Sequence, residues 1–367
     1  MKYKILHTLP DLHIGGVSNL LLLIIAEFND DIFEHHICYF GSDEALICKF
    51  QGLNVHIHKI EHSSNWGWFK TLFHFNQFVK IHNFDLIHSH LMLDRYITGI
   101  CSFFNKVPIV TTVHTTNIPS DHKKIIPALK LKFEDFLGKN TTTKFIAISE
   151  TVKSIAIKYR KIPENNILTI YSGIKILPPK SRMLSKEKIK MISVGRFIES
   201  KGFLDLIEVV RLLREKNILV NLTLVGQGPM DSILKKKVME LQLDNQVFFT
   251  GFIQNVGEYL NQSDIYVTAT KEEGFSIATV EALSHSLPVI TYDIPIFNEL
   301  SNNGSSFVTV PLSAIDEIVN KLISFLEDEV VYQSFSRNGY LRAKQYFNIQ
   351  NTAKSYLKLY KEIISKQ

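Results

Sequence analysis

A chain of 367 residues with 45% hydrophobic and 21% charged residues is long enough for two globular domains with sizeable cores. Its net charge of +5 is too small for the concentrated basic surface of a nucleic-acid-binding protein. The cysteines Cys38, Cys48 and Cys101 form no Cys-x-x-Cys pair, which indicates buried thiols in a reducing compartment and excludes a disulfide framework or a zinc finger. The longest apolar run, Leu20 to Ala26, is too short for a signal peptide with its cleavage site or for a membrane span, so we expect a cytoplasmic protein.

The first half of the chain alternates short apolar runs with longer helical patterns. Strands are predicted at residues 4–7, 36–40, 55–60, 84–89, 109–114, 144–149 and 167–171. Helices are predicted at residues 17–28, 68–81, 95–104 and 150–159. This alternation is typical of a parallel sheet with helices on both faces.

The alternation stops at residues 175–190, where Pro178-Pro179 and a run of Lys, Ser and Arg predict an inter-domain linker. A second series of strands is then predicted at 191–194, 220–225, 247–250, 265–269, 288–291 and 307–310, and the pattern is helical from 313 onward. We therefore predict domains at residues 1–175 and 176–348, with a closing helical segment at 349–367. In such sheets ligands bind at the carboxyl ends of the strands.

The sequence Glu273-Gly274-Phe275-Ser276 follows a predicted strand and precedes a helix predicted over 277–284. The amides and the dipole at a helix N-terminus favour an anion such as a diphosphate, and a glycine lets the backbone approach it closely. Glu281 lies about 9 Å farther along the helix than Phe275, which suits a carboxylate that accepts hydrogen bonds from ribose hydroxyls. Each glutamate alone is compatible with an ordinary helix cap or a solvated side chain, whereas the combination is more specific.

A second loop, from Gly195-Arg196 to Lys201-Gly202, follows the first strand of the second half. Arg196 can bind a phosphate through its planar guanidinium, and Lys201 can add a point charge. Taken alone, this spacing is more often an ordinary surface loop. Gly15-Gly16, just before a predicted helix, is compatible with a phosphate-binding loop and with a plain turn.

Other motifs are less informative. Gly226-Gln-Gly228 lacks the third glycine of a dinucleotide-binding loop, because position 231 is Asp, so a tight turn is favoured over NAD binding. His56-Ile-His58 and His88-Ser-His90 have no evident third ligand nearby, and no metal site is predicted. His114, at the end of a predicted strand, is expected to face the ligand. A P-loop, a serine nucleophile elbow and an Asp-x-Asp after an apolar strand are absent.

Together, these motifs resemble the retaining glycosyltransferases of family 4 over essentially the whole chain. The most specific part is the Glu-x7-Glu element, Glu273 and Glu281, with Gly274-Phe275. The remaining motifs stand in the family's order: Gly15-Gly16, 85–90, His114, Gly195-Arg196, Lys201-Gly202, Gly226-x-Gly228 and 287–290. The resemblance implies the α/β GT-B fold, in which two doubly wound, Rossmann-like parallel-sheet domains face each other across a cleft. A C-terminal helix, here at 352–364, crosses back to the N-terminal domain in that fold.

The resemblance also implies two sets of site residues. The donor-binding set is Gly15, Gly16, Phe252, Ile253, Gly274, Phe275, Ser276 and Glu281. The catalytic set is Glu273, His114, Arg196 and Lys201. In the family pattern Glu281 binds the ribose, Arg196 and Lys201 bind the diphosphate, and the Phe252-Ile253 backbone lies at the base. No metal or cofactor is expected, because positioning and charge stabilisation supply the catalysis.

The sequence departs from the family pattern in three places, none of which removes the diphosphate site. Ser276 stands where glycine is common, Tyr171-Ser-Gly-Ile174 replaces an Asn-Gly-Val-Asp type of loop, and Tyr292-Asp-Ile-Pro295 replaces a frequent Gly-Gly turn. The first two leave the identity of the donor open. A UDP-sugar is expected because it is the usual donor of such enzymes.

The predicted function is that of a hexosyltransferase that moves a hexose or N-acetylhexosamine to a hydroxyl of a carbohydrate or lipid-linked acceptor, in cell-surface polysaccharide or glycolipid assembly. Two alternatives stay open: a non-catalytic nucleotide-sugar-binding partner of another transferase, and a sugar-nucleotide epimerase of similar architecture. A basic and apolar segment after His114 fits either a peripheral contact with the inner face of the membrane or an ordinary amphipathic helix. Its lysines are Lys123, Lys124, Lys130 and Lys132. No nucleic-acid partner is expected.

Overall fold

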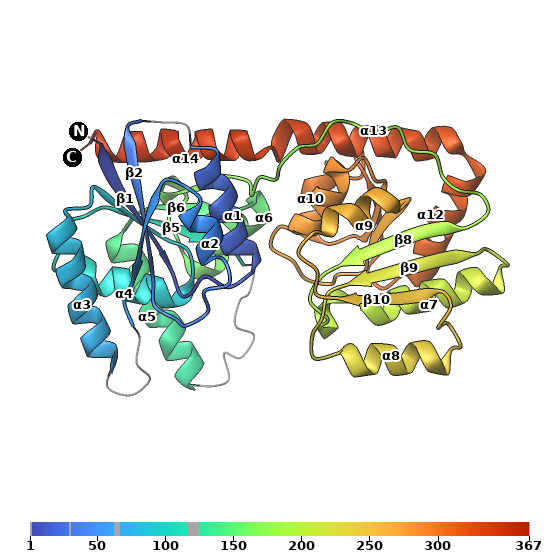
Figure 1. Cartoon of the computed structure of the whole chain (residues 1–367), viewed down its shortest axis with the longest axis horizontal. Helices are drawn as coiled ribbons and strands as arrows, with labels where there is room; N and C mark the ends of the chain where they lie inside the picture. Colours follow the sequence, from blue (N-terminus) through green and yellow to red (C-terminus); the bar gives the residue numbers. More distant parts are fainter. Residues whose placement is uncertain (1, 29–30, 62–66, 116–124, 367) are drawn as a thin grey trace. The chain divides into compact units, whose positions relative to one another are not determined.

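The computed structural model describes residues 2–28, 31–61, 67–115 and 125–366 of the chain (Figure 1). They form two compact units. Unit 1 contains residues 1–173 and 349–367, and unit 2 contains residues 174–348. Each unit is built on its own parallel sheet, so the predicted α/β fold with two Rossmann-like parallel-sheet domains is confirmed.

Unit 1 has a seven-stranded parallel sheet in the order β3-β2-β1-β4-β5-β6-β7. Its strands are β1 (Tyr3–Leu9), β2 (Phe33–Tyr39), β3 (Val55–Lys59), β4 (Leu86–Ser89), β5 (Ile109–Val113), β6 (Thr142–Ala147) and β7 (Ile167–Thr169). Its helices are α1 (Gly16–Ala26), α2 (Ile47–Gln51), α3 (Gly67–His82), α4 (Met92–Ser102), α5 (Ile125–Thr141), α6 (Glu150–Arg160), the short 3-10 turn η1 (Glu164–Asn166) and α14 (Ile349–Ile364).

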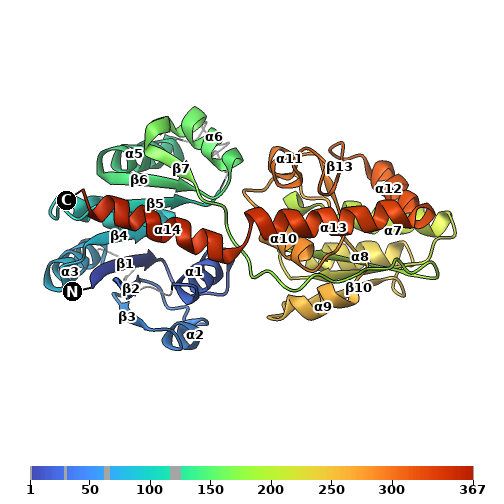
Figure 2. The same ribbon diagram turned by 90° about the horizontal axis from the view of Figure 1, so that it is seen from above.

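The two faces of this sheet bury alternate residues of the same strands, as the period of two requires. Ile5 and Val110 pack beneath α1 and α14, whereas their neighbours Leu6 and Ile109 pack beneath α3 and α4. Figure 2 shows α14 lying along the sheet beside α1. The strands are therefore buried on both sides, which explains why they appear in the sequence as short continuous apolar runs.

The closing helix α14 is joined to unit 1 by close contacts. The Tyr360 hydroxyl lies 2.6 Å from His88 Nδ1, and the Thr352 hydroxyl donates to the carbonyl oxygen of Tyr171 at 2.9 Å. A Cβ on Gly173 would lie 2.5 Å from the Ile349 Cα. Because real Cβ atoms do not approach that closely, only glycine allows the chain to pass the start of α14.

Unit 2 has a six-stranded parallel sheet in the order β10-β9-β8-β11-β12-β13. Its strands are β8 (Ile189–Val194), β9 (Val220–Val225), β10 (Val247–Gly251), β11 (Ile265–Thr268), β12 (Val289–Tyr292) and β13 (Val308–Val310). Its helices are the 3-10 turn η2 (Glu199–Lys201), α7 (Phe203–Glu215), α8 (Asp231–Glu240), α9 (Val256–Gln262), α10 (Ile277–Ser284), α11 (Pro295–Ser301), α12 (Ile315–Glu327) and α13 (Glu329–Tyr346). A large core lies between the sheet and α7, α8 and α12, and α10 packs with α13.

Three expectations from the sequence differ from the structure. The segment predicted as a linker packs on unit 2, because Arg182 is buried and donates to the carbonyl oxygens of Ser263 at 2.8 Å and His285 at 2.7 Å. Ser149, predicted at a strand end, is the N-cap of α6, where its hydroxyl accepts from the Val152 amide at 3.0 Å. Cys48 is exposed, whereas the other two cysteines are buried as predicted.

Candidate functional site

Two loops of unit 2 lie side by side at the carboxyl ends of the adjacent strands β8 and β11. The Lys271 amide donates to the carbonyl oxygen of Ser200 at 2.8 Å, which joins the loops directly. Gly202 has φ +65°, and a Cβ there would lie 2.1 Å from the carbonyl oxygen of Ala269. Gly202 therefore serves both a left-handed backbone conformation and the close approach of the two loops.

The second loop carries Glu273, whose carboxylate forms an ion pair with Lys201 from the first loop. The same carboxylate accepts a hydrogen bond from the Gly274 amide at 3.1 Å. The structure thus brings together two residues that are 72 positions apart in the sequence and that were both predicted as catalytic. A cationic side chain is held directly before α10.

Helix α10 begins at Ile277 with Ser276 as its N-cap. Ser276 has φ 65° and ψ 72°, a left-handed conformation that glycine adopts at lower cost, and its hydroxyl lies 2.7 Å from the Thr279 hydroxyl. Phe275 is buried against Phe347, with ring centroids 5.6 Å apart. The amides of the first helical turn have no acceptor within the helix, so this end can bind an anion.

Glu281 lies on the second turn of α10 and is largely shielded from solvent. Burial raises the pKa of its carboxyl group from 4.5 to about 7. Such a shift means that the ionised form lacks stabilising partners in the structure as it stands. Hydrogen-bond donors of a bound ligand would supply them.

The remaining predicted residues of unit 2 also lie at the carboxyl ends of the strands of its sheet. Arg196 follows β8, is exposed and forms no ion pair with any described residue. Phe252 and Ile253 follow β10, and the Phe252 side chain is 49% exposed. Gly226-x-Gly228 forms the tight turn that was favoured from sequence, because the Asp231 carboxylate accepts from the Gly228 amide at 2.7 Å.

In unit 1, Gly15 and Gly16 lie at the start of α1, with Gly15 as the N-cap. A Cβ on Gly15 would lie 2.5 Å from His13 Nε2. The His13 ring forms a hydrogen bond with the Asp11 carboxylate. This pair was not predicted, although the Asp-x-His spacing just before two glycines is present in the sequence.

His114 follows β5 and belongs to a row of histidines at the carboxyl ends of β1, β4 and β5. Its ring lies 5.9 Å from the ring of His90, which in turn lies 4.0 Å from that of His88 and 5.9 Å from that of His7. Burial, followed by the charge of Arg95, lowers the pKa of His114 to about 3, so its ring is neutral at pH 7. Its Nε2 has no partner among the described residues.

The geometry also identifies groups that could bind a metal ion. Among the described residues, three buried histidines, His7, His88 and His90, bring ligand atoms within 4.8 Å of one another. Both ring nitrogens of His88 already have partners outside this group, with Tyr360 at 2.6 Å and Thr112 at 2.7 Å, so neither nitrogen is left for an ion. We therefore describe this group as a hydrogen-bonded part of the core of unit 1.

The lysines considered for membrane contact are only partly visible. Lys123 and Lys124 lie outside the described residues. Lys130 lies in α5, and Lys132 on the same helix is exposed beside Phe133. None of the described helices combines the length and the apolarity that crossing a membrane requires.

Both halves of the chain match models of known protein families. A model of glycosyl transferases group 1 matches residues 179–342, and a model of glycosyltransferase family 4 matches residues 14–176. The chain is 26% identical over 310 residues to the UDP-Gal:alpha-D-GlcNAc-diphosphoundecaprenol alpha-1,3-galactosyltransferase of Escherichia coli, covering 80% of both proteins. It is 25% identical over 305 residues to the capsular polysaccharide biosynthesis glycosyltransferase CapH of Staphylococcus aureus, covering 81% of this chain and 83% of CapH. In fold it is similar to Anabaena HepE in complex with UDP, with a TM-score of 0.83 and 19% identity over 99% of this chain and 100% of HepE.

Proposed function

Because this chain belongs to glycosyltransferase family 4, we propose that it is a hexosyltransferase that takes a hexose or N-acetylhexosamine from a UDP-sugar. The ion pair between Lys201 and Glu273, directly before the helix that carries Glu281, is the observation on which this proposal rests. The similarity to an enzyme whose name specifies UDP-galactose and to HepE in complex with UDP supports UDP as the nucleotide.

We propose that the diphosphate binds at the start of α10. Lys201 moves its ammonium group from Glu273 to the diphosphate, and the exposed guanidinium of Arg196 forms a two-pronged contact with the same group. Glu281 accepts hydrogen bonds from the ribose hydroxyls. Glu273, relieved of its lysine, then accepts hydrogen bonds from the hydroxyls of the sugar.

The transfer itself forms a bond between the acceptor oxygen and the anomeric carbon and breaks the bond from that carbon to the diphosphate. Retention follows if both events occur on one face of the sugar, with the acceptor's hydroxyl proton passing to the departing phosphate oxygen. Arg196 and Lys201 stabilise the negative charge that grows on the diphosphate. The neutral ring of His114 is proposed to hold a sugar hydroxyl without adding a competing charge.

The proposal is tested by incubating the protein with UDP-, GDP- and ADP-linked hexoses and N-acetylhexosamines and identifying the products by proton NMR. We expect release of UDP and a product that keeps the anomeric configuration of the donor. Arg196→Ala and Lys201→Ala should each lower turnover by about 100-fold. Arg337→Ala and Lys321→Ala remove exposed cations elsewhere in unit 2 and should leave it unchanged.

The same assay distinguishes the alternatives. Binding of nucleotide sugars without turnover, with every donor and a range of acceptors, would favour a non-catalytic partner of another transferase. An isomerised nucleotide sugar formed without any acceptor would favour an epimerase. Inversion of the anomeric centre would overturn the proposed mechanism while leaving the transferase activity.

For the acceptor, we propose a sugar carried on a lipid or a growing polysaccharide, as the names of the E. coli and S. aureus relatives suggest. Aromatic side chains that are unusually exposed on α3 and α5 support contact with a membrane surface, among them Phe69, Phe73, Phe133 and Phe136. Co-sedimentation with anionic and neutral vesicles tests this. We expect binding that requires anionic lipid and that weakens in a Phe133→Ser, Phe136→Ser double variant. Equal amounts of protein in the pellet with and without vesicles would contradict the membrane contact.

A further inference from the structure

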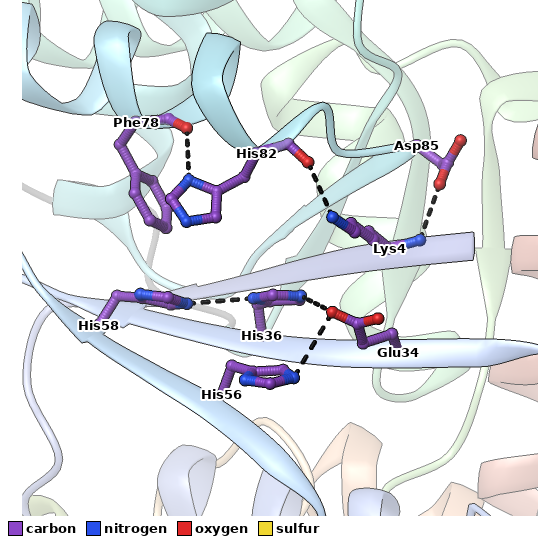
Figure 3. Close-up of polar contacts among 8 residues, drawn as sticks. All are labelled: Lys4, Glu34, His36, His56, His58, Phe78, His82 and Asp85. Atoms are coloured by element: carbon purple, nitrogen blue, oxygen red, sulfur yellow. Dashed lines mark hydrogen bonds and ion pairs between the residues drawn. The ribbon is translucent and has the colours of Figure 1, made fainter. Parts of the chain in front are cut away.

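A group of histidines and one glutamate lies at the N-terminal ends of β2 and β3 (Figure 3). This end of the sheet is opposite to the carboxyl ends of its strands. Glu34 and His36 are two residues apart on β2, so their side chains share one face of the sheet. His56 of β3 pairs directly with His36 in the register of the two strands. The three side chains consequently converge on one point.

The spacing of their polar atoms is close to that of ligands around a metal ion. Glu34 Oε1 lies 2.7 Å from His36 Nε2 and 3.5 Å from His56 Nε2, and all three atoms lie within 4.8 Å of one another. Ligands bound to zinc at about 2.0–2.2 Å in a tetrahedron are separated by about 3.3 Å. Small side-chain rotations would therefore suffice to bind an ion.

The central ligand is held in place by its surroundings. The His36 side chain is only 4% exposed and lies edge-on to Phe84, with ring centroids 5.0 Å apart. Its Nδ1 lies 3.0 Å from His58 Nε2, which leaves Nε2 directed at Glu34 (Figure 3). A second hydrogen bond of this kind, on the ring nitrogen away from the metal, fixes the orientation and tautomer of a histidine ligand.

Glu34 supplies the carboxylate of the group. The ammonium group of Lys4 donates to the carbonyl oxygen of His82 at 3.3 Å, and its charge acts on Glu34 without a direct ion pair. The carboxylate therefore remains available to a metal.

Solvent access is also present. The His56 side chain is 59% exposed and that of Glu34 is 32% exposed, so an ion can enter from the surface. Water would complete the coordination shell. Two imidazoles and one carboxylate are a ligand set that suits Zn²⁺ and neighbouring divalent transition metals, and not Mg²⁺ or Ca²⁺, which prefer oxygen ligands throughout.

We propose that Glu34, His36 and His56 form a binding site for Zn²⁺ or a similar divalent transition-metal ion. The site is independent of the proposed transferase chemistry, because it lies at the N-terminal ends of the strands, whereas His114 and Gly16 lie beyond their carboxyl ends. Its effect is structural: β3 is one of the two edge strands of the sheet in unit 1, and the ion joins it to β2. Binding stabilises the folded form in proportion to the metal concentration.

The test uses the untagged full chain and Co²⁺, whose visible absorption reports four-coordinate nitrogen and oxygen ligands, with Zn²⁺ as a competitor. We expect a saturable spectrum with one ion per chain, displacement by Zn²⁺, and a rise of several degrees in the unfolding temperature with Zn²⁺. His56→Ala and Glu34→Gln should each weaken Co²⁺ binding by at least 10-fold. His36 is left intact because the loss of a buried ring could disturb folding.

His74→Ala is the matched control, since it removes an exposed histidine from α3 of the same unit. It should leave the Co²⁺ spectrum and the affinity unchanged. An absence of saturable binding would overturn the proposal. So would a spectrum that His56→Ala leaves unchanged, because the ion would then sit elsewhere, for example at the buried His7, His88 and His90.

Discussion

Replacing Glu281 by glutamine should change how the stability of the protein depends on pH. The carboxyl group has a pKa of about 7 in the folded chain, where burial raises it from 4.5. A raised pKa means that the folded form holds its proton over a pH range in which the unfolded form has lost it. The free energy of unfolding therefore falls as pH rises from about 4.5 through 7, and the lost stability does not return above that range.

The size of the effect follows from the two pKa values. Each pKa unit corresponds to about 1.4 kcal/mol, so this group should remove about 2.5 kcal/mol between pH 5 and pH 8, and about 2 kcal/mol after allowance for its partial contact with solvent. Glutamine has nearly the same size and does not ionise. Glu281→Gln should therefore be more stable than the wild type at pH 8 and similar to it at pH 5.

Urea unfolding of both proteins at pH 5 and pH 8 measures this difference, and every other titrating group cancels between them. Because the chain has two units, the transition should be followed by a probe that reports unit 2, such as protection of its amides from hydrogen exchange. The same variant should bind UDP about 10-fold more weakly, because hydrogen bonds from ribose to a charged group are lost. Parallel stability curves for the two proteins, with equal UDP affinity, would refute both the burial and the role of Glu281.

Three further changes test the surrounding structure. Gly202→Ala should destabilise unit 2 by about 3 kcal/mol, because the new Cβ meets the Ala269 carbonyl oxygen, whereas Gly304→Ala, at φ +83° with nothing within 4 Å, should cost only about 1 kcal/mol in urea unfolding. Equal losses would show that the loops are not in close contact. Arg182→Met should lower stability by about 3 kcal/mol, since buried carbonyl oxygens lose a charged donor, and a change below 0.5 kcal/mol would show that the segment is a free linker. His114→Ala should lower kcat by about 100-fold with little change in the Kd for UDP, and an equal loss in both would assign His114 to nucleotide binding instead.

Much of the fold was predictable because the sheets are buried on both sides. The runs at 220–225 and 265–269 are apolar and bounded by polar turns, and they match β9 and β11 closely. Errors arose where the hydrogen bonds of a single polar side chain decide the structure. Ser149 was predicted at the end of a strand, but its hydroxyl caps the N-terminus of α6. Arg182 was predicted as part of a polar linker, but its guanidinium donates hydrogen bonds to carbonyl oxygens about 80 to 100 residues away in the sequence.

The candidate site was predictable only where local sequence defines it. The stretch from Glu273 to Ser276 predicts a loop before a helix, and in the structure it directly precedes α10. The ion pair of Glu273 with Lys201 depends on β8 and β11 being neighbours, and strand order is not visible in a single sequence. The same holds for His56: its sequence neighbours offer no third metal ligand, whereas the pairing of β2 with β3 supplies Glu34 and His36.

The central claim is that the diphosphate of a UDP-sugar binds between the loop of Arg196 and Lys201 and the first turn of α10. Titration calorimetry with UDP tests it most directly. The wild type should bind UDP, and Arg196→Ala and Lys201→Ala should each weaken binding by at least 10-fold, with Arg337→Ala unchanged. Undiminished UDP affinity in both variants would contradict the account.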